Sequence, residues 1–66
     1  AEPIDRQLLL LARSKGVAGF SLNDAVLALD PAVELVELRR VLEDLQQHEL
    51  LLISNDEQGR VVYREP

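Results

Sequence analysis

The sequence contains no cysteine, which excludes disulfide bonds, thiolate metal sites and a cysteine nucleophile. Aromatic residues are scarce as well, with only Phe20 and Tyr63, so a hydrophobic core has to be built mainly from leucine and valine. No apolar run approaches the roughly 18 residues of a membrane-spanning helix. The N-terminus also lacks the basic and then apolar layout of a signal peptide. These absences predict a soluble, cytoplasmic protein without a membrane partner that folds by packing alone.

Methionine is absent too, so Ala1 is either a processed start or the cut end of a longer chain. We expect the cut end, because the last predicted strand finishes with no tail beyond Pro66. The length of 66 residues predicts one domain, residues 1–66, excised from a larger protein.

Basic charge is also in short supply. Twelve acidic residues face seven lysines and arginines, for a formal net charge of −5. Half of the acidic residues fall within residues 30–50, where Arg39 and Arg40 are the only cations. Nucleic-acid backbones are bound mainly by lysine and arginine, so this acidic balance disfavours a phosphate-binding surface.

Proline and glycine divide the chain into three helices and a hairpin. The first helix is predicted over residues 3–14, with Pro3 in its first turn and Gly16 after its end. A short extended link, one bridge of strand long, is expected at residues 17–20. Ser21 and Asp24 then form a capping box, which begins a short helix over residues 22–29. This second helix should bury Val26 and Leu29, and Ala25 beside them.

The third helix is predicted from Asp30-Pro31, an N-cap followed by a first-turn proline, to about His48. Its apolar residues fall within an arc of roughly 120° at 100° per residue. They are Leu35, Leu38, Val41, Leu42 and Leu45. This arc is the strongest helical signal in the chain and predicts the central part of the core.

Two strands are predicted at residues 51–54 and 60–64. The turn between them, residues 55–59, is polar and carries Gly59 late, where a bulged hairpin requires a left-handed residue. The order is therefore helix, short strand, helix, helix and hairpin, an α+β fold.

This order resembles the winged helix-turn-helix superfamily over nearly the whole chain. The matching stretches are IDRQLLLLARSKG, SLNDAVLAL, LRRVLEDLQQHELLLIS and NDEQGRVVYRE. The resemblance implies three helices, a short first strand and a C-terminal β-hairpin wing. Members of this superfamily bind DNA or RNA, dimerise, or bind proteins, so the fold leaves the function open.

This sequence departs in two ways from a DNA-binding winged helix, and both concern its function. The third helix, which would enter the major groove, carries Glu43 and Asp44 where basic side chains are expected. The turn of the wing is likewise acidic. We therefore expect a non-catalytic module that recognises protein, either a partner or a second copy of itself. The alternative is the DNA-binding domain of a transcriptional regulator.

Each of these two hypotheses has its own candidate residues. For a protein contact, the face opposite the leucine arc carries Val33, Val36, Arg40 and Gln47. Two β-branched residues on a solvated helix face would add nothing to its stability, which favours a covered surface unless the second helix or the turn covers them internally. For DNA, the candidate contacts are Arg39, Arg40, Gln47, Arg60 and Arg64. Intrahelical pairing of Arg39 and Arg40 with Glu43, Asp44 and Glu37 competes with this role and is the favoured expectation.

Catalysis has no candidate residues. His48 is the only histidine and lacks a second metal ligand, so it is expected to cap a helix end. Glu43 and Asp44 diverge by about 100° on a helix and cannot flank one substrate. There is no glycine-rich phosphate loop. No catalytic residue, metal, cofactor or small-molecule substrate is expected.

Overall fold

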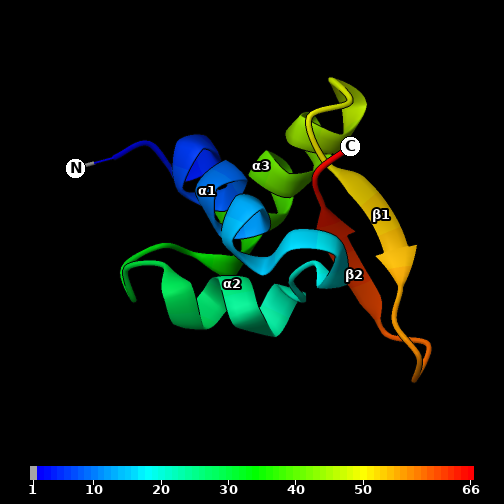
Figure 1. The fold of residues 1–66 in the computed structure, drawn as a ribbon. Coiled ribbons are helices and arrows are strands. Elements are labelled where there is room, and N and C mark those ends of the chain that lie inside the picture. The colour runs from blue at the N-terminus through cyan, green and yellow to red at the C-terminus, as the bar shows by residue number, and fades with distance from the viewer. Residues whose placement is uncertain (1) are drawn as a thin grey trace.

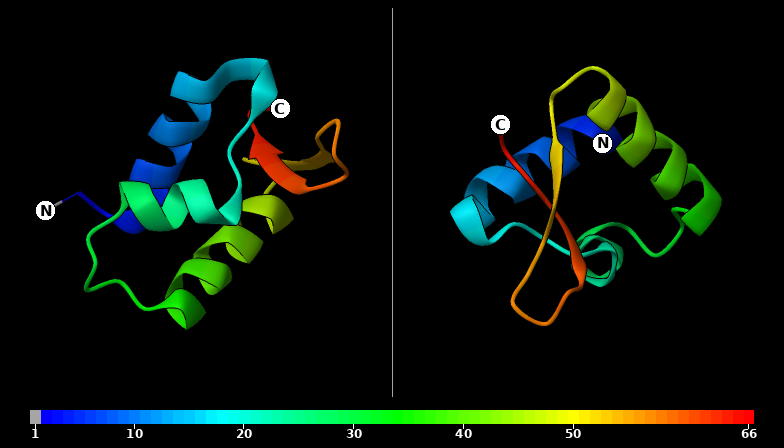
Figure 2. Two further views of the ribbon diagram at one scale, coloured as in Figure 1. Left: turned by 90° about the horizontal axis from the view of Figure 1, so that it is seen from below. Right: turned by 90° about the vertical axis from the view of Figure 1, so that its right-hand side faces the viewer.

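Three helices precede a two-stranded antiparallel hairpin in the computed structural model, which describes residues 2–66 (Figure 1). The helices are α1 (Ile4–Lys15), α2 (Leu22–Ala28) and α3 (Leu35–Gln47), and the strands are β1 (Leu52–Asn55) and β2 (Val61–Arg64). The helices surround the core on three sides, and the hairpin lies beside them (Figure 2). The predicted α+β class is thereby confirmed.

The first helix ends where the sequence predicts. Pro3 stands directly before α1, and its carbonyl accepts the first helical bond, from the N–H of Gln7. Gly16, with φ at +65°, closes the other end. The link that follows differs from the prediction, because residues Gly16–Ala18 form one 3₁₀ turn instead of an extended segment. This turn is closed by a bond from Gly19 N–H to the Gly16 carbonyl.

The predicted capping box at the start of α2 is confirmed. The Ser21 hydroxyl accepts from Asp24 N–H at 3.1 Å, and the Asp24 carboxylate accepts from Ser21 N–H at 3.0 Å. Ala25 and Leu29 are buried as expected. Val26 is not, since 48% of it is exposed. The helix has only seven residues, and its single buried stripe passes through Ala25 and leaves Val26 on the open side.

The prediction that α3 begins at Asp30-Pro31 is wrong, because the helix begins four residues after this proline. Asp30 and Pro31 instead start a turn. The Asp30 carboxylate accepts from Ala32 N–H at 2.8 Å, and its carbonyl accepts from Val33 N–H at 2.9 Å. Aspartate followed by proline is favourable at the first two positions of a β-turn as well as at a helix start, and the turn is what forms here.

The other end of α3 is a Schellman motif. Leu50 N–H bonds to the Leu45 carbonyl and Glu49 N–H bonds to the Gln46 carbonyl, a pattern that satisfies the last turn of the helix. Glu49 adopts the left-handed conformation, with φ at 60°. The His48 ring lies against the end of the helix as expected, and its Nδ1 is 2.8 Å from the Asp44 carbonyl. A carbonyl only accepts, so Nδ1 carries the hydrogen in this contact.

The predicted bulged hairpin is confirmed, with the first strand shifted by one residue and the second one residue shorter than predicted. Gly59 has φ at 80°, and its N–H bonds to the Asp56 carbonyl within the turn. The Asp56 carboxylate accepts from the N–H of both Gln58 and Arg60, which holds the polar turn together. The cross-strand pairs are Leu52 with Arg64, Ile53 with Tyr63, Ser54 with Val62, and Asn55 with Val61.

Phe20 extends this sheet on the other side of β2. It exchanges two backbone bonds with Tyr63, of 2.8 and 2.7 Å, and the two rings lie 5.5 Å apart. The predicted single bridge of strand is therefore present at Phe20. Gly19 permits this close approach, since a Cβ atom there would stand 2.7 Å from the Tyr63 carbonyl oxygen.

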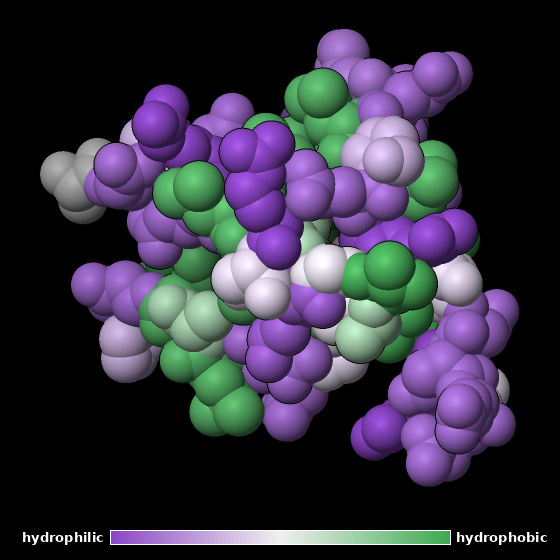
Figure 3. All heavy atoms as spheres, in the orientation of Figure 1, coloured by the Kyte–Doolittle hydropathy of each residue, from purple (hydrophilic) through white to green (hydrophobic). Residues whose placement is uncertain are grey.

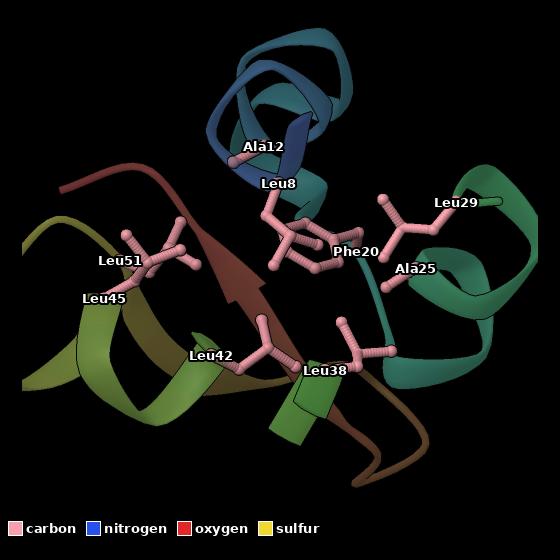
Figure 4. Close-up of a cluster of buried hydrophobic side chains, with 9 residues drawn as sticks. All are labelled: Leu8, Ala12, Phe20, Ala25, Leu29, Leu38, Leu42, Leu45 and Leu51. Carbon is pink, nitrogen blue, oxygen red and sulfur yellow. The ribbon is translucent and has the colours of Figure 1, made fainter. Parts of the chain in front are cut away.

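The core lies where the three helices and the Phe20 bridge meet (Figure 4). The buried residues of the cluster are Leu8, Ala12, Phe20, Ala25, Leu29, Leu38, Leu42, Leu45 and Leu51. Three of the five predicted arc residues, Leu38, Leu42 and Leu45, are confirmed as core. Val41 is half-buried. Leu35 is 50% exposed, because it lies in the first turn of α3 at the edge of the core.

Within residues 2–66, no helix combines the length and apolar composition that crossing a membrane requires.

Candidate interaction surface

The solvent-facing side of α3 carries three of the four predicted contact residues. Val36, Arg40 and Gln47 are spaced by four and seven residues, which places them on one face of the helix. All three are exposed, Val36 by 62%. The Gln47 amide donates to the Glu43 carboxylate at 3.5 Å, so an acidic group lies within this face. Internal covering of Val36 by α2 is thereby excluded.

Val33 does not belong to this face, which corrects the sequence prediction. It precedes α3, so counting 100° per residue from Val33 does not describe its position. Its N–H is bonded into the Asp30 turn, and its side chain packs, half-buried, against the core. The predicted four-residue face is therefore divided between the helix and the connection before it.

A mostly apolar groove lies where α2, the connection and α3 meet. We call it the α2–α3 groove, and its volume is about 180 Å³. Its lining residues are Val26, Leu29, Asp30, Pro31, Val33, Leu35 and Leu38. Only Asp30 among them is charged, and Val26 and Leu35 are each about half exposed. Sequence reasoning missed this groove because it assigned the connection to α3; the preference of Asp-Pro for turns was the signal that could have located it.

Figure 3 shows how polarity is distributed over one side of the molecule. Apolar atoms gather over α2, at the lower left, while the turn of the hairpin at the lower right is uniformly hydrophilic. Leu27 on α2 is 77% exposed, and Ala28 next to it is exposed as well. Exposed apolar side chains thus occur both in the α2–α3 groove and elsewhere on α2.

A second groove, between α3 and β2, is polar. It is lined by Arg39, Glu43, Gln46, Gln47 and Tyr63. Its single cationic residue therefore stands with a carboxylate, and the lining has no formal net charge. A phosphate approaching Arg39 in this groove would also approach Glu43.

The five candidate DNA contacts lie on α3 and on the hairpin. Arg39 and Gln47 line the α3–β2 groove, and Gln47 also borders the exposed face of α3 that carries Arg40. The Arg60 guanidinium is held by the Asp56 carboxylate at 2.9 Å. Arg64 is half-buried, and its Nε is buried without a hydrogen-bond partner in the described part of the chain.

The expected intrahelical pairing of Arg39 and Arg40 is wrong. In residues 2–66, ion pairs join Arg6 to Glu2, Arg13 to Glu65 and Arg60 to Asp56, and none involves either arginine of α3. On an exposed helix such a pair gains only about 0.2–0.5 kcal/mol, which is too little to hold two long side chains together.

Two carboxylates take part in local hydrogen bonds that lower their pKa values. The pKa of Asp24 is lowered chiefly by the hydrogen bond from Ser21 N–H. The pKa of Asp56 is lowered chiefly by the hydrogen bond from Arg60 N–H. Both carboxylates therefore stabilise local structure as anions. No cluster of three histidine, aspartate or glutamate side chains suited to a metal ion occurs between residues 2 and 66.

Comparison with models of known protein families gives no match for this chain, and comparison with curated proteins gives none either.

Proposed function

We propose that this chain is a winged-helix module that recognises protein without catalysing a reaction. The order of elements supports the winged-helix assignment, and so does the arrangement of the sheet. That architecture has a short first strand, and its C-terminal hairpin forms the wing. Here Phe20 pairs with β2, which pairs with β1. The first helix and α3 pack across the core beside this sheet.

The observation that carries the protein-binding function is the contrast between apolar and basic surface. The α2–α3 groove offers exposed Val26 and Leu35, with Val36 nearby in sequence on the first turns of α3. Protein contacts use such apolar spots surrounded by polar groups. Between α3 and the hairpin, Arg39 lines the same groove as Glu43, and Arg60 is paired with Asp56, so these two cations each stand with a carboxylate.

DNA binding remains the second candidate on one specific observation. Arg39 and Arg40 have no acidic partner within residues 2–66, so both guanidinium groups are available to phosphates. If the protein-binding function is correct, a random-sequence duplex at about 150 mM salt should bind no more tightly than about 10⁻⁴ M. Fluorescence anisotropy measures this directly. Sub-micromolar binding with a steep salt dependence would favour the DNA function instead.

A photo-reactive residue at Leu35 tests the protein-binding function in the cells that make this protein. We expect adducts with a discrete partner, and we expect Val36→Glu in the same chain to reduce them while the melting temperature stays unchanged. The same photo-reactive residue at Glu57, in the hydrophilic turn of the hairpin, is the control. Equal adducts from both positions, or adducts indifferent to Val36→Glu, would contradict a specific contact at this surface.

A further inference from the structure

Within residues 2–66 the outer edge of β1 has no pairing strand, and its backbone geometry follows from the Phe20 bridge. Tyr63 directs its N–H and its carbonyl to Phe20, away from β1. Tyr63 and Ile53, which face each other, are therefore a non-hydrogen-bonded pair. In such a pair the N–H and the carbonyl of Ile53 point outward. The same alternation directs the backbone of Asn55 outward too.

The side chains along this edge are uncharged. Residues 50–55 read Leu-Leu-Leu-Ile-Ser-Asn, and Leu50, Leu52 and Ile53 are all exposed, Ile53 by 45%. Proteins usually protect a free strand edge by keeping the strand very short, or with a lysine, a proline, a bulge or a covering segment, and β1 is short, with four residues. Strand β1 has no lysine, no proline and no charged residue. It is thus an apolar edge with free donors and acceptors.

We propose that this edge pairs with the same edge of a second copy, in an antiparallel arrangement about a twofold axis beside Ile53. Antiparallel pairing of identical strands is self-complementary, since each outward N–H meets an outward carbonyl of the other copy. With the axis at Ile53, the two isoleucines face each other, and Leu52 lies opposite Ser54 of the other copy. The two hairpins then form one continuous sheet, from Phe20 of one copy to Phe20 of the other.

Charge favours this edge over α3 as the place of contact between two copies. Two molecules that each carry −5 repel each other, and an interface through acidic α3 would bring carboxylates together. Strand β1 itself carries no carboxylate. Screening by salt should therefore strengthen the dimer, which is the opposite of the salt dependence expected for binding to DNA.

The size of the β1 edge determines how stable the expected dimer is. A stable interface buries about 800 Å² per partner, which would be a sixth of the 4777 Å² of accessible surface in this chain. A strand of four residues with its neighbouring leucines covers less than that. The dimer should therefore be weak, and its population should rise with concentration.

This inference rests on the proposed protein-binding function and names a second copy of the chain as one partner. It uses the β1 edge and not the α2–α3 groove, so either proposal can fail while the other stands. The experiment compares Ile53→Glu with Val36→Glu. Both replace an exposed β-branched residue by the same anion, one at the β1 edge and one on α3. Sedimentation equilibrium of the wild type up to about 1 mM should show a mass rising toward that of a dimer. Ile53→Glu should weaken dimerisation at least tenfold, and Val36→Glu should leave it unchanged.

A second measurement does not depend on how well Ile53→Glu folds. The chain has no cysteine, so Ile53→Cys introduces a single thiol. Facing residues of a hydrogen-bonded antiparallel pair have Cα atoms about 5.5 Å apart, within the range of a disulfide. Mild oxidation should cross-link Ile53→Cys into a dimer and leave Val36→Cys monomeric. A wild type that stays monomeric, equal weakening by both glutamates, or cross-linking only at position 36 would each overturn the proposal.

Discussion

The two connections between helices differ in how they are held. Residues 16–21, between α1 and α2, pass against β2, where Phe20 is fully buried and exchanges two backbone bonds with Tyr63. Residues 29–34, between α2 and α3, are held mainly by bonds to their own Asp30 and leave the α2–α3 groove open. Tertiary contacts with β2 cover the first connection, whereas the second leaves apolar surface exposed. Under the proposed function, a partner would bind at the open connection without disrupting the fold.

The strongest test of this contrast compares two leucines of α3. Leu42 is 2% exposed in the core, whereas Leu35 is 50% exposed at the groove. We expect Leu42→Ala to lower the free energy of unfolding by about 2–5 kcal/mol. In a domain of this size such a loss leaves little folded protein. Leu35→Ala should cost about 1 kcal/mol or less, since it buries less apolar surface. Thermal and urea melts of both variants measure these losses in the free energy of unfolding. Similar losses would mean that Leu35 and Leu42 do not differ in their contribution to the core.

The second test concerns the glycines of the closed connection. Gly16 and Gly19 both have positive φ, but a Cβ atom meets nothing within 4 Å at Gly16. At Gly19 it would stand 2.7 Å from the Tyr63 carbonyl oxygen. Gly16→Ala should cost about 1–2 kcal/mol through backbone strain alone. Gly19→Ala should cost about 1–3 kcal/mol more, because the link must move away from β2. Equal denaturation midpoints for the two variants would show that the Phe20 bridge is not tight.

A smaller effect is expected at the end of the closed connection, in the capping box. Hydrogen bonding lowers the pKa of Asp24 below its ordinary value of 3.8, so the anion stabilises the folded state above this pH. The stabilisation is lost as the pH falls from 3.8 through the lower pKa of the folded state. Asp24→Asn removes the titrating group, so its stability should not change with pH on this account. Parallel curves of stability against pH for the two proteins would contradict a folded-state role for the Asp24 anion.

The smallest effect is expected on the exposed face of α3. Val36→Glu should change the free energy of unfolding by no more than about 0.5 kcal/mol, because Val36 is 62% exposed. A urea melt of this variant checks it. A loss of several kcal/mol would mean that Val36 stabilises the fold and that its side chain is not available to a partner.

Much of the fold followed from local signals in the sequence. The capping box, the spacing of Leu38, Leu42 and Leu45, and the late Gly59 each depend on interactions within a few residues. Such interactions are satisfied by the segment itself, so its sequence is sufficient to predict them. The candidate site was predicted less well. Val36, Arg40 and Gln47 share an exposed face as expected, whereas Val33 and the expected ion pairs of Arg39 and Arg40 were wrong.

The tertiary structure decided what local signals left open. Asp30-Pro31 is equally suited to a helix start and to a turn, and the turn places Val33 against the core. Nothing near Phe20 in the sequence identifies Tyr63 as its partner, and the outward direction of the Ile53 backbone follows only from that pairing. Local hydrogen bonds and periodicity therefore determined the helices and the hairpin. Packing between distant segments decided which apolar side chains and which strand edge remain exposed, because burial depends on neighbours that the local sequence does not specify.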